Sequence, residues 1–219
     1  MAKAAAPTTV VRKRKKVDTW KDKGWYEVLA PKMFNEVKVG ETISSNPTNL
    51  IGRIVEASMK DVLGDFSKQH IKLRFQIEDV KGDKAYTTFK GQSLSREYMR
   101  SQIRRKTTRV EGVADVETKD GIRLRVKTIG LAMGRAQTAQ EKLVRKIMVD
   151  IVRKAASEAP LEQFIQEVVQ GKLSMDMYKA SNKIYPLKRI EVRKVQLLKP
   201  KRKEEVAATE GPAGPESSA

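Results

Sequence analysis

The pattern of hydrophobic and polar positions has a period of two in the first part of the chain. The clearest case is HIKLRFQIEDV, in which every second residue is apolar: Ile71, Leu73, Phe75 and Ile77. Such alternation predicts a strand with one buried face. The turn KGDK and the run AYTTFKGQ that follow predict its hairpin partner. Shorter runs, WYEVLA and EVKVGE, also favour strands, and Asp120-Gly121 predicts a hairpin turn between two later strands.

From residue 138 onward the apolar positions recur with a helical period. Between residues 138 and 156 they form one stripe, made of Leu143, Val144, Ile147, Met148, Ile151, Val152 and Ala155. TAQE at 138–141 has the form of a capping box. Pro160 predicts the start of a second helix and Gly171 its end, with five buried residues between them: Leu161, Phe164, Ile165, Val168 and Val169. A third helix is expected over 174–184, before a last strand in LKRIEVRKVQLL.

These elements predict an α+β protein. Six to eight short strands joined by hairpin turns favour an antiparallel, barrel-like core, flanked by two to four helices. We expect residues 20–198 to form a single domain. The first 19 residues predict a disordered basic arm, and residues 199–219, rich in Glu, Ala, Pro, Gly and Ser, predict a flexible tail.

The net charge indicates what kind of partner this fold binds. The chain carries a formal charge of +18, with a sequence pI near 10.0. Residues 1–16 hold six basic residues and no acid, whereas residues 201–219 hold three basic and four acidic residues. Most of the excess therefore lies in the expected domain, which indicates a polyanion as its partner. The absence of cysteine excludes disulfides and thiolate metal sites, and no apolar run predicts a membrane span.

The densest basic stretch is SREYMRSQIRRKTTRVEG at 95–112. Its basic residues are Arg96, Arg100, Arg104, Arg105, Lys106 and Arg109, and no acid lies between Glu97 and Glu111. Ser95 is a candidate N-cap, so the stretch predicts a helix that turns into a strand. Arg96, Arg100 and Arg104 would form one stripe on that helix, and Met99 and Ile103 would face the body. A solvated basic face is the alternative, but a face with so few acids favours contact with RNA phosphate.

Other basic residues are weaker candidates for RNA contact. The arm contains Arg12, Lys13, Arg14, Lys15 and Lys16, which are typical of import signals and of RNA-binding arms alike. Arg53 follows Gly52, where a bulge and a contact with Glu56 are expected. The polar face of the 138–156 helix contacts either solvent or RNA, through Lys142, Arg145, Lys146 and Arg153.

The remaining candidate residues favour structural roles. Trp20, Trp25 and Tyr26 could stack on bases, but we expect them to pack in the core or to anchor the first strand. His70, the only histidine, is expected at the surface or at a strand end. Glu56, Asp61 and Asp65 form no evident acid/base or metal site. The sequence therefore predicts a protein that is not an enzyme and needs no metal or cofactor.

Four stretches together resemble the small-subunit ribosomal protein family S3Ae of archaea and eukaryotes, with an archaeal member favoured. They are DTWKDKGWYEVLAPKMF at 18–34, LIGRIVEASMKDV at 50–62, GQSLSREYMRSQIRRKTTRVEGVADVETKDG at 91–121, and the helical region 138–170. The segment after residue 200 matches no motif of that family.

The resemblance implies a cytoplasmic ribosomal protein. Its partners would be small-subunit ribosomal RNA, on the platform near the messenger exit, and neighbouring ribosomal proteins, without a membrane and without self-association. A non-ribosomal RNA-binding factor that acts in translation or RNA processing is the alternative. An RNA-cleaving enzyme would need an acid/base constellation that the sequence does not offer.

Overall fold

The computed structural model describes Trp20 and residues 23–198 of the chain. The predicted basic arm, with the candidates Arg12, Lys13, Arg14, Lys15 and Lys16, and the predicted tail lie outside the described residues. None of the helices that are described is long and apolar enough to cross a membrane.

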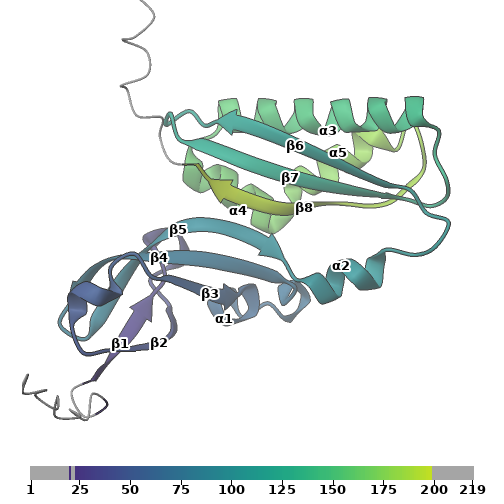
Figure 1. Cartoon of the computed structure of the whole chain (residues 1–219). Helices are drawn as coiled ribbons and strands as arrows, with labels where there is room; N and C mark the ends of the chain where they lie inside the picture. The colour runs from purple at the N-terminus through teal and green to yellow at the C-terminus, as the bar shows by residue number, and fades with distance from the viewer. Residues whose placement is uncertain (1–19, 21–22, 199–219) are drawn as a thin grey trace, which may run out of the picture.

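The first half of the described chain is a small, curled sheet (Figure 1). Its strands are β1 (Gly24–Leu29), β2 (Lys38–Ser44), β3 (Ile54–Ser58), β4 (Ile71–Lys81) and β5 (Lys84–Leu94). Four short helical turns connect them: η1 (Lys32–Phe34), η2 (Pro47–Leu50), α1 (Met59–Leu63) and η3 (Phe66–Lys68). Strands β3, β4 and β5 pair antiparallel, as do β1 and β2, but β1 runs parallel to β5.

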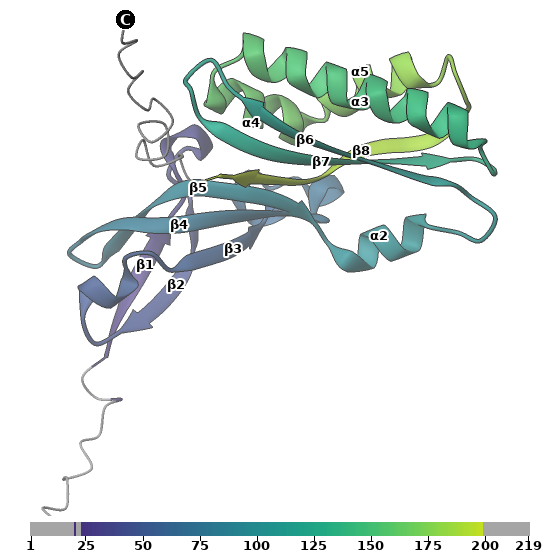
Figure 2. The same cartoon turned by 45° about the horizontal axis from the view of Figure 1, so that its top comes forward.

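The second half is a three-stranded antiparallel sheet covered by helices. Helix α2 (Arg96–Gln102) leads into it, and its further elements are β6 (Arg109–Glu117), β7 (Arg123–Ala132), α3 (Thr138–Glu158), α4 (Leu161–Gln170), α5 (Lys172–Ser181) and β8 (Leu187–Leu197). Helices α3, α4 and α5 lie together on one face of β6, β7 and β8 (Figure 2). The α+β class predicted from the sequence is confirmed.

The predicted antiparallel, barrel-like core is wrong. The described strands form one open, mixed sheet in the order β2-β1-β5-β8-β7-β6, with β3 and β4 branching from β5. The sheet does not close because β5 continues past β1 and pairs with β8, which leads into the second half. At the open side, between β2 and β3, a side chain makes the connection: Arg53 Nη1 donates to Thr42 Oγ1 (3.2 Å) and to the Ile43 carbonyl (3.0 Å).

The pairing of β5 with β8 joins the two halves at Gly91. Only three residue pairs form this ladder, from Gly91 opposite Gln196 to Ser93 opposite Lys194. A Cβ atom on Gly91 would lie 2.5 Å from the Val195 carbonyl oxygen, which is closer than any side chain allows. A glycine is therefore required for the strands to meet here.

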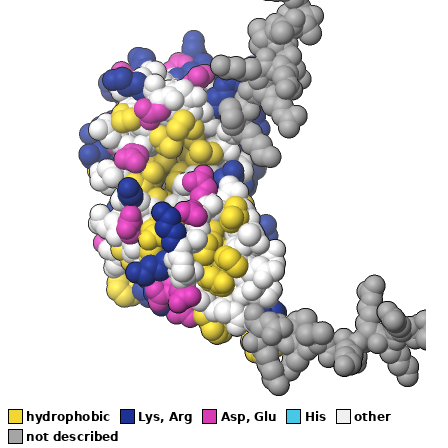
Figure 3. All heavy atoms as spheres, turned by 90° about the vertical axis from the view of Figure 1, so that its left-hand side faces the viewer, with side chains coloured by type: hydrophobic (Ala, Val, Ile, Leu, Met, Phe, Trp, Pro, Cys, Tyr) yellow, Lys and Arg dark blue, Asp and Glu magenta, His cyan; other side chains and the backbone are white. Residues whose placement is uncertain are grey.

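Helix α4 contributes to the cores of both halves. Phe164 and Val168 pack in the cluster beneath β6, β7 and β8, whereas Ile165 and Val169 pack with β4 and β5. All four side chains are at most 4% exposed. A hollow of about 400 Å³ remains between the halves at the end of β8, and the apolar half of its lining consists of Pro31, Met33, Phe89, Leu161 and Leu197. On that side of the molecule, hydrophobic side chains gather between acidic and basic ones (Figure 3).

The helix ends agree with the sequence in part. Gly171 ends α4 in the left-handed conformation (φ 88°), as predicted. The capping box of α3 is made by Gln137 and Gln140, because Thr138 is already helical. Helix α5 ends at Ser181, and Leu143, expected in the buried stripe of α3, is 52% exposed. Of the predicted stripe, Val144, Met148 and Val152 are buried, together with Ala156, whereas Ile147, Ile151 and Ala155 are half-buried.

The tryptophans do not pack in the core, which was one of the two structural roles expected for them. Trp20 is 63% exposed and Trp25 is 61% exposed. Trp25 faces solvent because alternate residues of β1 point to opposite faces, and its neighbours Tyr26 and Val28 take the buried one. Tyr26 packs against the small cluster around Val28, as expected. His70 directly precedes β4, as expected, and is half-buried.

The predictions around Gly52 are corrected as well. Gly52 has a φ of 87° in the turn before β3 and is not a bulge within a strand. Glu56 pairs with Arg74, directly opposite on β4, at 2.6 Å between Oε1 and Nη2. The partner of Glu56 is therefore Arg74 and not Arg53, whose guanidinium contacts β2.

Candidate nucleic-acid interface

The helix predicted in the basic stretch is shorter than the sequence indicates. Ser95 is its N-cap, as predicted, because its Oγ accepts from the backbone N–H of Tyr98 (3.3 Å). The helix ends at Gln102, and Ile103 has extended dihedrals (φ −80°, ψ 122°). Arg96 and Arg100 therefore share a helical face, but Arg104 lies beyond the helix. Met99 is half-buried and Ile103 is 37% exposed. The prediction that both side chains are buried in the body is therefore wrong.

The remaining basic residues of the stretch follow in a loop. Arg104, Arg105 and Lys106 are exposed, and Lys106 has a positive φ of 62°. Arg109 begins β6, with its Nε 3.3 Å from Glu111 Oε1. The basic residues at 104–106 thus extend the charge of α2 toward β6 without a regular stripe.

A groove of about 620 Å³ lies between α2 and the central strands. We call it the basic groove. It is lined by seven basic residues, which are Lys72, Arg74, Arg96, Arg100, Arg109, Arg193 and Lys194. Three acidic residues also line it: Glu56, Glu97 and Glu111. With seven basic residues against three acidic ones, the lining of the groove carries a net positive charge.

Part of this charge is not neutralised within the protein. Lys72, Arg96 and Arg100 are exposed and form no ion pair with another described residue. Arg74 pairs with Glu56 through Nη2, but its Nε is buried and has no hydrogen-bond partner in the described part of the chain. Burial is the main cause that lowers the pKa of the Lys194 ammonium, and the nearby positive charges of Arg74, Lys127 and Arg193 lower it further. A bound anion would relieve this crowding of cations.

Four of the groove residues were not predicted from the sequence: Lys72, Arg74, Arg193 and Lys194. The alternation in β4 already places Lys72 and Arg74 on its polar face. Their proximity to Arg193 and Lys194 depends on the pairing of β5 with β8, which no local pattern shows. The sequence therefore indicated that Lys72 and Arg74 share the polar face of β4, but it did not indicate the groove.

The structure does not bring the other predicted cations to this groove. Lys142, Lys146 and Arg153 are exposed on α3, which lies on the far side of β6, β7 and β8. Arg145 Nε donates to the Glu111 carbonyl (2.8 Å), which ties α3 to β6. Arg53 is occupied by its hydrogen bonds to β2.

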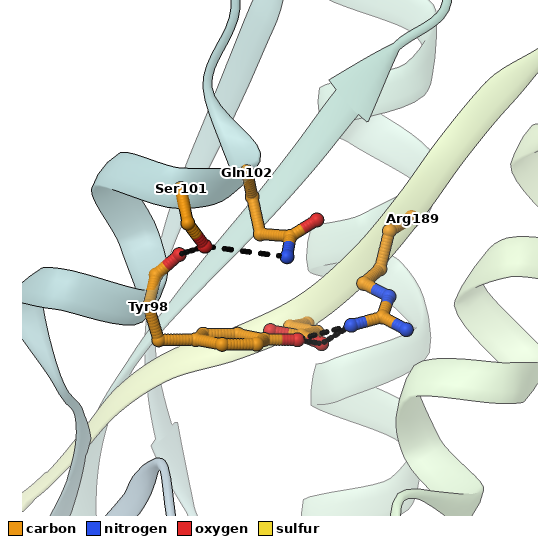
Figure 4. A network of polar contacts seen from close by, with 5 residues as sticks. Tyr98, Ser101, Gln102 and Arg189 are labelled. Atoms are coloured by element: carbon orange, nitrogen blue, oxygen red, sulfur yellow. Dashed lines mark hydrogen bonds and ion pairs between the residues drawn. The ribbon is translucent and has the colours of Figure 1, made fainter.

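Tyr98 attaches α2 to the second half of the protein (Figure 4). Its hydroxyl donates to Glu191 Oε1 of β8 (2.6 Å) and accepts from Arg189 Nη1. The ring stacks on His70, with 4.0 Å between the ring centroids and 22° between the planes. Burial, with the hydrogen bond to Glu191, raises the pKa of Tyr98 to about 12, and burial lowers the pKa of His70. No local pattern in the sequence indicates this contact.

We expect Tyr98→Phe to loosen α2. The change removes the hydrogen bonds to Glu191 and Arg189, which should lower the free energy of unfolding by about 1 to 2 kcal/mol. Amide hydrogen exchange at residues 96–102, measured by mass spectrometry, should become faster. Tyr86→Phe is the matched control, because the Tyr86 hydroxyl makes no hydrogen bond within the described structure. Equal exchange at 96–102 in both variants would contradict the anchoring role.

The acidic residues considered for chemistry each have a local structural partner. Glu56 pairs with Arg74, Asp61 Oδ2 accepts from the Ser58 N–H in the capping box of α1 (3.3 Å), and Asp65 lies 3.7 Å from Lys68 Nζ. Within the described ranges, no three His, Cys, Asp or Glu side chains come together as metal ligands would. These geometries give the three acids structural roles.

Fold and groove together define a basic α+β protein with a surface suited to a polyanion. Comparison with known proteins specifies the family. Residues 11–201 match the model of the Ribosomal S3Ae family, and the chain belongs to this family. The resemblance found in the sequence is thereby confirmed, and a family of ribosomal proteins agrees with the prediction that the chain is not an enzyme.

Three of the similar proteins come from archaea. A protein of Desulfurococcus amylolyticus is 44% identical over 181 residues, which cover 83% of this chain and 85% of the relative. A protein of Methanothermobacter thermautotrophicus is 43% identical over 85% of this chain and 96% of its own length. A protein of Methanobrevibacter smithii is 41% identical over 90% of this chain and all of its own. Each relative is named small ribosomal subunit protein eS1.

Proposed function

We propose that this chain is a structural component of the small ribosomal subunit that binds ribosomal RNA through the basic groove. The observation that carries the proposal is a set of three cations in the groove, Lys72, Arg96 and Arg100, that have no ion-pair partner among the described residues. The archaeal relatives named small ribosomal subunit protein eS1 support the assignment to that subunit. The resemblance described above supports a place on the platform near the messenger exit.

Phosphate contacts account for the binding in this proposal. The guanidinium of Arg presents a planar fork that matches phosphate oxygens, and Lys provides a point charge. The buried Nε–H of Arg74 adds a donor from which an RNA phosphate oxygen could accept a hydrogen bond. Such contacts carry no base information, so the shape of the RNA, with phosphates spaced to fit the groove, determines where the protein binds.

The other predicted cations take secondary places in this proposal. The loop residues Arg104, Arg105 and Lys106, with Arg109, extend the contact from the end of α2. The arm at 12–16 follows the RNA backbone outward, and Lys142, Lys146 and Arg153 on α3 contact either a second RNA segment or solvent. Arg53 and Arg145 act within the fold. Neighbouring small-subunit proteins complete the set of partners, on ribosomes of the cytoplasm and without a cofactor.

Sedimentation of small subunits tests this function against the alternative of a cycling factor. We expect the full-length protein to stay with the small subunit through a wash at moderate salt, because many phosphate contacts and protein neighbours hold it together. A translation or processing factor that cycles on and off should be removed by the same wash. Quantitative mass spectrometry of the gradient fractions measures the ratio to other small-subunit proteins. A ratio far below one after the wash would favour the cycling factor.

A further inference from the structure

A second groove lies on the opposite face of the central sheet. It has a volume of about 640 Å³ and is bounded by α2, α4, α5, β8 and the start of β4. Ile71 and Gln92 line it, whereas their neighbours Lys72 and Ser93 line the basic groove. Successive residues of a strand point to opposite faces, so the two grooves are separated by the sheet itself. We call the second one the apolar groove.

The floor of the apolar groove is aliphatic. Val168 and Val169 of α4 lie at its base, and Met175 and Tyr178 of α5 form one wall. Met175 is 63% exposed, although it stands beside this apolar floor. An exposed methionine next to a hydrophobic hollow is typical of surfaces that bind peptide segments, because its flexible thioether adapts to different side chains.

The rim of the apolar groove is basic. Lys68, Lys179, Lys188 and Arg189 line it with one acidic residue, Glu191. The carboxylate of Glu191 is already occupied by the Tyr98 hydroxyl and by Arg189 (3.3 Å). An occupant with carboxylates therefore complements the rim.

One buried side-chain amide, that of Gln92, lies in the lining of the apolar groove. Gln92 is 2% exposed, and its side-chain oxygen Oε1 accepts no hydrogen bond from any described residue. A buried carbonyl oxygen without a donor is unfavourable. An N–H group of a molecule in the groove would satisfy it.

We propose that the apolar groove binds a short acidic segment of a neighbouring protein. An apolar side chain of the segment packs on Val168, Val169 and Met175, its carboxylates face Lys179 and Lys188, and one of its N–H groups donates to Gln92 Oε1. RNA would match the basic rim but would leave the aliphatic floor without an apolar partner. The proposal does not depend on RNA binding in the basic groove, because the two surfaces lie on opposite faces of the sheet.

Site-specific photocrosslinking in assembled small subunits tests this proposal. Met175 is replaced by p-benzoylphenylalanine in the full-length chain, and Met133, which is 65% exposed and outside the groove, is replaced in the same way as the control. We expect irradiation to yield a crosslinked protein from position 175 that position 133 does not yield. Adding Lys179→Glu and Lys188→Glu to the position 175 chain should reduce that crosslink about tenfold, since charge complementarity is lost.

Several results would overturn the proposal. They are crosslinks from position 175 to RNA alone, crosslinks to residues 199–219 of the same chain, and the absence of any crosslink in subunits that contain the protein. The sedimentation profile of the same samples shows whether the chain has entered subunits, so a failure of the proposed ribosomal function is recognised separately.

A second measurement uses the free full-length protein in case the crosslinking variant does not assemble. A short fluorescein-labelled peptide rich in Glu and Leu serves as the probe in fluorescence anisotropy. Met175→Glu should weaken its binding about tenfold, whereas Met133→Glu should leave it unchanged. If the wild-type protein binds this peptide no better than a peptide rich in Lys and Leu, the proposal is wrong.

Discussion

Replacing Lys72, Arg96 and Arg100 with Gln should weaken RNA binding by on the order of 10²- to 10³-fold. The three side chains line the basic groove, are exposed, and have no ion-pair partner among the described residues. At about 1 to 1.5 kcal/mol for each contact of an exposed side chain, three lost phosphate contacts account for an effect of this size. The slope of log K against log salt should fall by about 0.7 to 0.9 for each contact, or about 2 to 3 in total.

A salt series with a structured fragment of small-subunit ribosomal RNA measures both quantities. The control is a second triple variant, Lys32→Gln, Lys119→Gln and Lys183→Gln, which removes the same charge from exposed positions outside the groove. The far-UV circular dichroism of both variants should match that of the wild type, because all six side chains are exposed. Equal losses of affinity and slope in the two variants would show that net charge, and not the groove, determines binding.

Gly91→Ala should lower the free energy of unfolding by about 1 to 3 kcal/mol or more. The new Cβ atom would meet the Val195 carbonyl oxygen at 2.5 Å. Backbone atoms cannot rotate away as a side chain can, so β5 and β8 would have to separate. Because their ladder has only three residue pairs, little other pairing holds the two strands together here.

Urea denaturation followed by circular dichroism measures this effect. We propose that residues 20–198 unfold as a single unit, because α4 packs in the cores of both halves, and a single transition is therefore expected. Gly40→Ala in β2 is the control, since a Cβ atom there meets nothing within 4 Å. Its effect should stay within about 0.5 kcal/mol. Similar stabilities for the two variants would contradict a close contact at the joint.

The elements that the sequence predicted well depend on local patterns. Alternation in HIKLRFQIEDV gave β4, with Ile71, Leu73, Phe75 and Ile77 all buried. The helical period after residue 138 gave α3 and α4, and Gly171 was identified as the residue that ends α4. In each case the residues that produce the pattern are neighbours in the chain, so their geometry follows from the period of one element.

Predictions that needed distant contacts were less accurate. Helix α2 was expected to continue through Arg104, but it ends at Gln102 because none of its residues is buried and no core supports another turn. The tryptophans were expected to pack in the core or to anchor the first strand, because aromatic residues are scarce, yet the register of β1 turns Trp25 to solvent. Hydrophobicity indicates which residues favour burial, but the pairing of a strand determines which face is buried.

The sequence by itself determined the α+β class, the main helices and strands, the basic character of the domain and the family. Only the tertiary structure decided how the surfaces are assembled. Lys72 and Arg193 lie far apart in the chain, and they line one groove because β5 pairs with both β4 and β8. A strand has two hydrogen-bonding edges that accept any partner of suitable register, so local residues do not specify the neighbour. The packing of the whole chain determines which strands pair, here through Gly91 and α4. The resulting pairing leaves the sheet open where the sequence had suggested a barrel.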